Sequence, residues 1–164
     1  MRKLIYVLVA IVALGTASCS KSMSQYDKEI DQAEKMMLSN PDSALSMLDA
    51  IDASELKIDS LWAKYHFIKG YGHLKRNRSM IGDSLIIYAH DYYRGKNLVR
   101  DIRSGIVLAW YKFWVGDTPG AMTMLDSLAG LPDVPDSLMT QTLRIRVMLG
   151  ASAVSYTHLR AHET

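Results

Sequence analysis

The chain is poor in cysteine and proline. Cys19 is the only cysteine among 164 residues, so no disulfide can form within one molecule. There are four prolines and no low-complexity run, and 49% of the residues are hydrophobic. No segment shows the period-two alternation of a solvated strand. This composition is typical of an ordered domain rather than a disordered chain, and it favours helices.

The central part of the chain has no excess charge of either sign. Three of the 19 basic residues (Arg2, Lys3 and Arg160) and one of the 17 acidic residues (Glu163) lie outside residues 19–153. The remaining 16 basic and 16 acidic residues cancel. We therefore expect no nucleic-acid binding through bulk charge. This stretch is long enough for one domain with its own core.

Motifs of known chemistry are also missing. There is no glycine-rich phosphate loop, no nucleophile elbow, no paired-carboxylate site and no helical His-Glu metal motif. His66 and His73 are seven positions apart on one predicted helix, and we interpret them and His90 as structural or solvent-facing. We expect no enzymatic activity, no metal and no cofactor.

The N-terminus has three zones that are typical of a secretory signal peptide over residues 1–18. Arg2 and Lys3 are positive, 4–14 is apolar, and 15–18 is a run of small residues. The apolar run is shorter than the ~20 residues of a membrane span, which makes a permanently anchored helix the weaker alternative.

Cys19 and the three residues before it resemble the lipobox of bacterial lipoproteins. The motif reads Thr16-Ala17-Ser18-Cys19 and departs from the family by having Thr16 where leucine is usual. The resemblance implies that Cys19 carries a diacylglyceryl group and becomes the new N-terminus. The alternative is an ordinary signal peptide cut near Ala17, with Cys19 left as a free thiol.

A short polar stretch over residues 19–25 is expected to tether the lipid to the fold. No acidic cluster follows Cys19. In the lipoproteins of the Bacteroidetes type that the chain resembles, such a cluster marks display on the cell surface. The resemblance therefore implies anchoring in the cell envelope, at the outer membrane and facing the periplasm.

Residues 154–164 resemble the translation of a transposase-based sequencing adapter, codon by codon over the whole segment. A genuine polar tail is the alternative. On the adapter interpretation, this segment is non-native and the natural protein is truncated at about Ala153. His158 and His162 then carry no chemistry.

Apolar residues recur at helical spacing through the rest of the chain and predict seven helices. These begin near Ser24, Pro41, Asp59, Gly82, Leu98, Thr118 and Asp136. The predicted buried stripes include Leu38 in the first segment and Leu85 in the fourth. Asp-Ser dipeptides stand at four helix starts, at 42–43, 59–60, 83–84 and 136–137. We expect them to cap the first turns rather than to act as nucleophiles.

The helices form pairs that repeat along the chain. Ala44, Leu85 and Ala121 occupy equivalent places, 41 and 36 positions apart. These spacings are close to the ~34-residue period of tetratricopeptide repeats. Residues 26–153 resemble the degenerate tetratricopeptide-repeat lipoproteins of the Bacteroidetes type, which implies an all-α solenoid of about three helical hairpins and a truncated helix. A non-repeating all-α bundle is the rival.

This resemblance implies a membrane-anchored scaffold that binds a peptide or protein partner through its repeats. The aromatic clusters at 110–114 and 88–93 are interpreted mainly as core, with Tyr111 and Trp114 off the buried stripe as partner contacts. The basic segment 75–78 is interpreted as a solvated loop that could meet an acidic group. The alternatives are the sensor half of a membrane-associated regulator with a missing output domain, and a glycan-capture lipoprotein.

Overall fold

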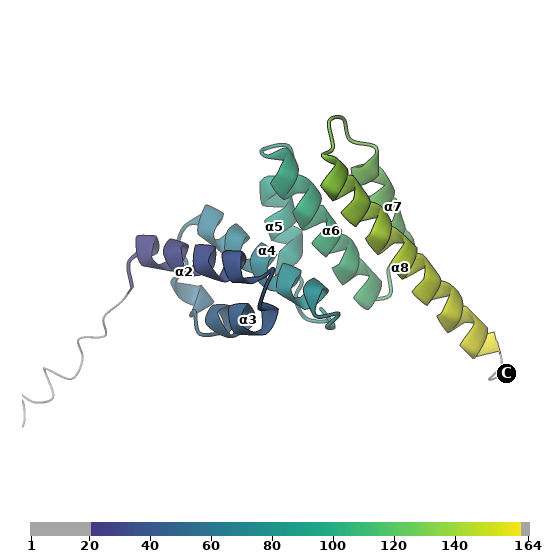
Figure 1. The fold of residues 1–164 in the computed structure, drawn as a ribbon. Helices are drawn as coiled ribbons and strands as arrows, with labels where there is room; N and C mark the ends of the chain where they lie inside the picture. Colours follow the sequence, from purple (N-terminus) through teal and green to yellow (C-terminus); the bar gives the residue numbers. More distant parts are fainter. Residues whose placement is uncertain (1–20, 162–164) are drawn as a thin grey trace, which may run out of the picture.

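The structure, a computed structural model, describes residues 21–161, with side chains as far as residue 152. This range holds seven α-helices, one 3-10 helix and no strand, which confirms the predicted all-α class (Figure 1). The elements are α2 (Met23–Met36), α3 (Pro41–Asp49), η1 (Ala53–Glu55), α4 (Asp59–Lys75), α5 (Leu85–Tyr93), α6 (Leu98–Trp114), α7 (Thr118–Ala129) and α8 (Asp136–Ala161). Every predicted helix is present, and each begins within a few residues of its predicted start.

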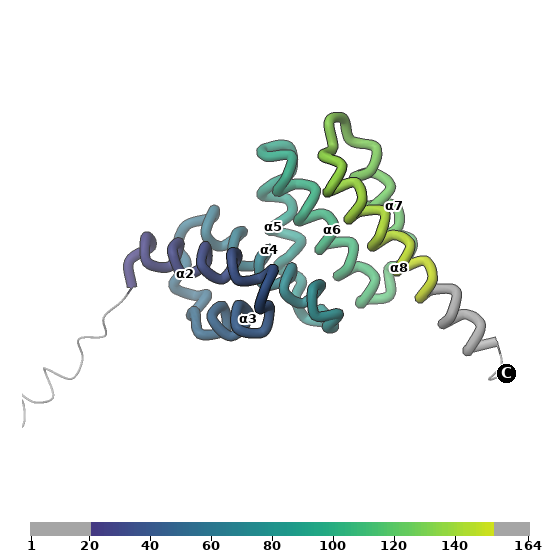
Figure 2. Tube along the Cα trace, in the orientation of Figure 1, coloured from purple at the N-terminus to yellow at the C-terminus, as the bar shows by residue number. Residues whose placement is uncertain are grey.

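The helices follow one another in space in the order of the sequence (Figures 1 and 2). Each helix packs on the next, and contacts also join α2 to α4, α4 to α6 and α6 to α8. The helices α2, α4, α6 and α8 thus form a continuous row. We call it the first-helix row, after the first helix of each pair predicted from the sequence. The helices α3, α5 and α7 each pack against the row helices that precede and follow them.

The caps of the helices differ from those predicted. The N-cap side chains that accept a backbone N–H belong to Ser22, Asn40, Asn97 and Asp117. The helices α4 and α5 start without a side-chain cap. Asp42, Asp59 and Asp136 lie inside first turns, where a carboxylate favours the positive end of the helix dipole. The prediction that the Asp-Ser dipeptides supply the capping oxygens is therefore wrong for α3, α4 and α5.

One continuous core runs between the helices. Most predicted stripe residues are buried, among them Ile30, Leu48 and Leu125. Two are exposed, Leu38 at 71% and Leu85 at 42%, and four more are only partly buried, namely Tyr92, Tyr93, Phe113 and Met122. Leu38 lies beyond the last residue of α2, where the helical period no longer sets its direction.

The exposure of Leu85 contradicts its predicted place on the buried stripe of α5. Ala44 and Ala121 are fully buried, as expected at the close approach of paired helices. In α5 the buried residue is Ile86, one position after Leu85. A Cβ at Gly70 of α4 would lie 2.8 Å from Val107 Cγ1 and 3.0 Å from Met80 Cε, so this glycine lets α6 and Met80 pack closely beside Ile86.

Two sharp turns end the helices of the row. Asn77 (φ 50°) and Gly116 (φ 87°) adopt left-handed backbone directly after α4 and α6. The following N–H groups bond back to carbonyls of the last turn, Arg78 to His73 and Asp117 to Lys112. This pattern is the Schellman arrangement that terminates a helix, and it suits asparagine and glycine. It fixes where α4 stops, within the basic segment 75–78.

Candidate functional site

An ion bridge crosses the middle of the first-helix row. Glu34 of α2 accepts two hydrogen bonds from the Arg100 guanidinium of α6, at 2.6 and 2.7 Å, and a longer one of 3.4 Å from Arg103. All three side chains are partly buried. Burial disfavours the charged form of Arg100, but its hydrogen bonds to Glu34 outweigh that cost and raise its pKa. The group is called the Glu34 bridge below.

Aromatic rings lie beneath the Glu34 bridge. The Arg100 guanidinium is 5.2 Å from the centre of the Phe67 ring. Arg103 is 4.8 Å from the centre of the Tyr71 ring. Both distances are within the ~6 Å at which cations are attracted to ring faces. Phe67 and Tyr71 lie on α4, so this helix supplies an aromatic floor at the centre of the row.

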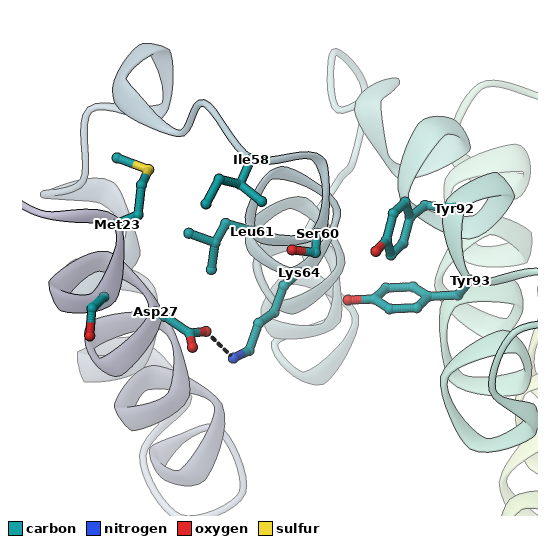
Figure 3. Close-up of a pocket in the computed structure, with 9 residues that line it drawn as sticks. Met23, Asp27, Ile58, Ser60, Leu61, Lys64, Tyr92 and Tyr93 are labelled. Carbon is teal, nitrogen blue, oxygen red and sulfur yellow. Dashed lines mark hydrogen bonds and ion pairs between the residues drawn. The ribbon is translucent and has the colours of Figure 1, made fainter.

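A first groove lies on the N-terminal side of the bridge, between α2, the start of α4 and the end of α5 (Figure 3). It encloses about 470 Å³. Its lining residues are Met23, Ser24, Asp27, Ile58, Ser60, Leu61, Lys64, Tyr92 and Tyr93. Figure 3 shows Tyr92 and Tyr93 reaching toward Lys64 from the side opposite Asp27. We call it the α2–α4 groove.

The charges of the α2–α4 groove are already neutralised within the chain. The Lys64 ammonium donates to Asp27 at 2.7 Å and lies 2.5 Å from Asp31. Burial opposes the charge on Lys64, but these hydrogen bonds outweigh it and raise the pKa of the ammonium. Burial also raises the pKa of Tyr93 to about 12, so its hydroxyl stays protonated as a donor. The groove therefore offers tyrosine hydroxyls and apolar surface rather than net charge.

A second groove lies on the other side of the bridge, between the last turn of α4 and α8. It encloses about 530 Å³. Its lining residues are Tyr71, Leu74, Lys75, Asn77, Ser137, Thr140, Gln141, Arg144, Ile145 and Met148. We call it the α4–α8 groove. Along α4 the order is Lys64, Phe67 and Tyr71, so the bridge separates the two grooves on the same row of helices.

The predicted contact residues Tyr111 and Trp114 both lie near the end of α6, but only Tyr111 lines one of the cavities described here. Tyr111 is partly buried and lines a third cavity, of about 410 Å³, with residues of α5 and α7. Trp114 is partly buried and packs edge-on against Trp110 and Phe113. Both side chains belong to the edge of the core. Their role in partner binding stays a prediction.

The histidines are dispersed among structural contacts. His66 packs edge-on against Trp62 and Tyr65, and burial lowers its pKa to about 4. His90 is buried, with Nδ1 3.1 Å from Ser104 Oγ. His73 Nδ1 lies 2.8 Å from Asp83 Oδ2. Across the described residues, no three His, Cys, Asp or Glu side chains gather closely enough to hold a metal ion.

Three further points concern the N-terminus, membrane-spanning helices and the basic segment 75–78. Cys19 and the rest of residues 1–20 lie outside the described residues. Within residues 21–161, no helix has the length and apolarity needed to cross a membrane. The basic segment 75–78 is exposed as predicted, and Arg76 and Arg78 both reach Asp42 of α3, at 3.0 and 3.2 Å.

The sequence analysis predicts neither the two grooves nor the Glu34 bridge. Glu34 and Arg100 are 66 positions apart, so no local pattern joins them. The available signal is the placement of like charges on one helical face, Asp27 with Asp31 and Arg100 with Arg103. No protein family, curated protein or solved structure matches this chain.

Proposed function

We propose that the chain is a lipid-anchored scaffold of the bacterial cell envelope that binds a peptide or protein partner along the first-helix row. The observation that carries this proposal is the presence of two grooves along α4, with the Glu34 bridge packed on α4 between them. Clefts of a few hundred Å³ that combine apolar floors with a few polar groups are the usual form of binding sites.

The repeat arrangement is part of the proposal. We interpret α2–α3, α4–α5 and α6–α7 as three tetratricopeptide-like hairpins, with α8 as the first helix of a fourth. The contacts of each first helix with the next support this interpretation, because stacked hairpins bury a stripe that none buries alone. The first-helix row would then be the inner face of a solenoid.

Cross-linking in the native envelope tests the scaffold. A photo-reactive residue is placed at Tyr92 in the α2–α4 groove, at Gln141 in the α4–α8 groove, and at Trp114. The matched control is Thr123, an exposed position on α7 away from both grooves. We expect a discrete adduct from a groove position and none from Thr123. Adducts that are equally strong at Thr123, or absent from both grooves, would contradict the proposal.

Lipid attachment is tested separately by feeding cells a palmitate analogue. We expect the wild-type chain to take up the label and Cys19→Ala to take up none. Label that persists in Cys19→Ala would overturn the anchor and leave the grooves unaffected.

A further inference from the structure

The α4–α8 groove is basic, and its positive groups lack acidic partners. Its lining includes Lys75 and Arg144 and no aspartate or glutamate. Both side chains are exposed, and neither forms an ion pair with an acidic group among the described residues. The other two cavities differ, since Asp27 lines one and Asp91 and Asp117 line the other. Of these three cavities, only the α4–α8 groove is lined by uncompensated positive charge.

The positive groups project from fixed backbone. Lys75 is the last residue of α4, two positions before the left-handed Asn77. Arg144 lies on α8 beside the buried Ile145, which belongs to the stripe that holds α8 to the core. Arg144 presents a planar fork of N–H donors, which matches a carboxylate with two parallel hydrogen bonds. The Lys75 ammonium lies 5.5 Å from the centre of the Tyr71 ring.

Neutral polar and apolar groups complete the groove. The side chains of Asn77, Thr140 and Gln141 line it and make no hydrogen bond within the described part of the chain. They can therefore donate to and accept from a peptide backbone. Tyr71, Leu74 and Ile145 form the floor, and Met148 adds exposed apolar surface. A ligand for this surface has carboxylates, backbone amides and apolar side chains close together.

We propose that the α4–α8 groove binds an acidic peptide segment in which carboxylate side chains alternate with apolar ones. Lys75 and Arg144 hold the carboxylates, the polar lining meets the backbone, and the apolar side chains lie on the floor. This inference rests on the proposed function and names the chemistry of the partner at one of its two grooves.

Fluorescence anisotropy with the full chain in detergent tests the inference. The probe is a short labelled peptide in which glutamate alternates with leucine, and its counterpart carries glutamine for glutamate. The test variant is Lys75→Glu with Arg144→Glu. The control is Lys28→Glu with Lys35→Glu, which makes the same charge change at two exposed lysines of α2, outside every groove described above.

We expect the glutamate peptide to bind at least about tenfold more tightly than the glutamine peptide. The groove variant should lose at least about tenfold in affinity and the control less than about twofold. Equal binding of both peptides, or equal losses in both variants, would overturn the inference. Displacement of the peptide by inorganic phosphate or by phosphatidylglycerol vesicles at similar concentration would also overturn it, because the groove would then select any anion.

Failure of this inference can be separated from failure of the scaffold. If the groove variant keeps its envelope cross-links from Tyr92, the chain binds a partner elsewhere on the first-helix row and only the acidic-peptide assignment is wrong. If the wild-type chain gives no adduct from either groove, the scaffold itself is wrong.

Discussion

Glu34 makes a two-bond ion pair with a residue far away in the sequence. It joins α2 to α6 by two hydrogen bonds of 2.6 and 2.7 Å to one guanidinium. Its side chain is 17% exposed, so removing it leaves Arg100 and Arg103 without their carboxylate in a partly buried site. Such a loss costs more than an exposed ion pair is worth, because the stranded charges stay desolvated.

We expect Glu34→Ala to lower the free energy of unfolding by about 1 to 3 kcal/mol. Glu29→Ala is the control on the same helix, since Glu29 pairs with Lys21 at the surface and should lose at most about 1 kcal/mol. Urea denaturation of the two variants measures both values. Equal losses would mean that the bridge adds nothing beyond a surface ion pair.

His66 makes stability depend on pH. Burial lowers its pKa from 6.5 in the unfolded chain to about 4 in the folded one. Between these values, falling pH protonates the unfolded chain at His66 and leaves the folded chain neutral there. The contribution of His66 to the free energy of unfolding is therefore present above pH 6.5 and is lost as pH falls toward 4.

His66→Gln should flatten this dependence. We expect the variant to lose less stability than the wild-type chain between about pH 7 and about pH 5, where the carboxylates are still mostly ionised. Burial also lowers the pKa of His90, and this background is common to both proteins. Denaturation at several pH values in this window gives the slopes. Identical slopes would show that His66 has the same pKa in the folded and unfolded chains.

At the scale of the element, close approach between helices depends on small residues. Gly72 lies in the interior of α4, and a Cβ built there would lie 2.6 Å from Leu45 Cδ2 and 2.9 Å from Leu45 Cγ. Leu45 is itself buried, so it has little room to move. Glycine lowers the helix propensity at this position of α4, but it allows α4 to approach α3 closely.

We expect Gly72→Ala to destabilise the chain by a net amount of about 1 to 2 kcal/mol, since overpacking outweighs the gain of about 1 kcal/mol in propensity. Gly150→Ala in α8 is the matched control. A Cβ there meets only Met122 Cε, at 3.8 Å, so the variant should be neutral or slightly more stable. Thermal melts of the wild-type chain and of both variants measure these changes in stability. Stabilisation by Gly72→Ala would show that Leu45 yields easily.

At the scale of the whole molecule, the row of helices ends in a helix with a second apolar face. The buried face of α8 includes Leu138, Ile145 and Leu149, which pack toward the core. Leu143 is 46% exposed and Val147 is 69% exposed on another face. Stacked helical pairs leave such a face at each end, and exposed apolar patches promote association.

We expect the chain to self-associate through α8, and Leu143→Ser with Val147→Ser to reduce this without lowering the melting temperature. The control is Leu38→Ser with Ile81→Ser, which removes two apolar side chains that are at least as exposed and lie elsewhere. Sedimentation of chains that start at residue 19 and carry Cys19→Ser measures association. An equal reduction of association by the control would indicate non-specific hydrophobic association rather than association through α8.

The helices could be predicted from the sequence because their signals are local. Pro41 and Pro119 stand in first turns, Gly116 ends α6, and apolar stripes such as 30, 33 and 37 repeat at helical spacing. Each signal acts within one or two turns of backbone. The class of fold and the order of its helices therefore followed from the sequence by itself.

The site and the details of packing depended on the tertiary structure. Leu85 turns outward and Ile86 inward, and the choice between these two adjacent apolar residues depends on how α5 packs against α4. The Glu34 bridge and the α4–α8 groove join residues more than 60 positions apart. Such contacts follow from how rigid helices stack, and no pattern along one helix encodes the distance to another.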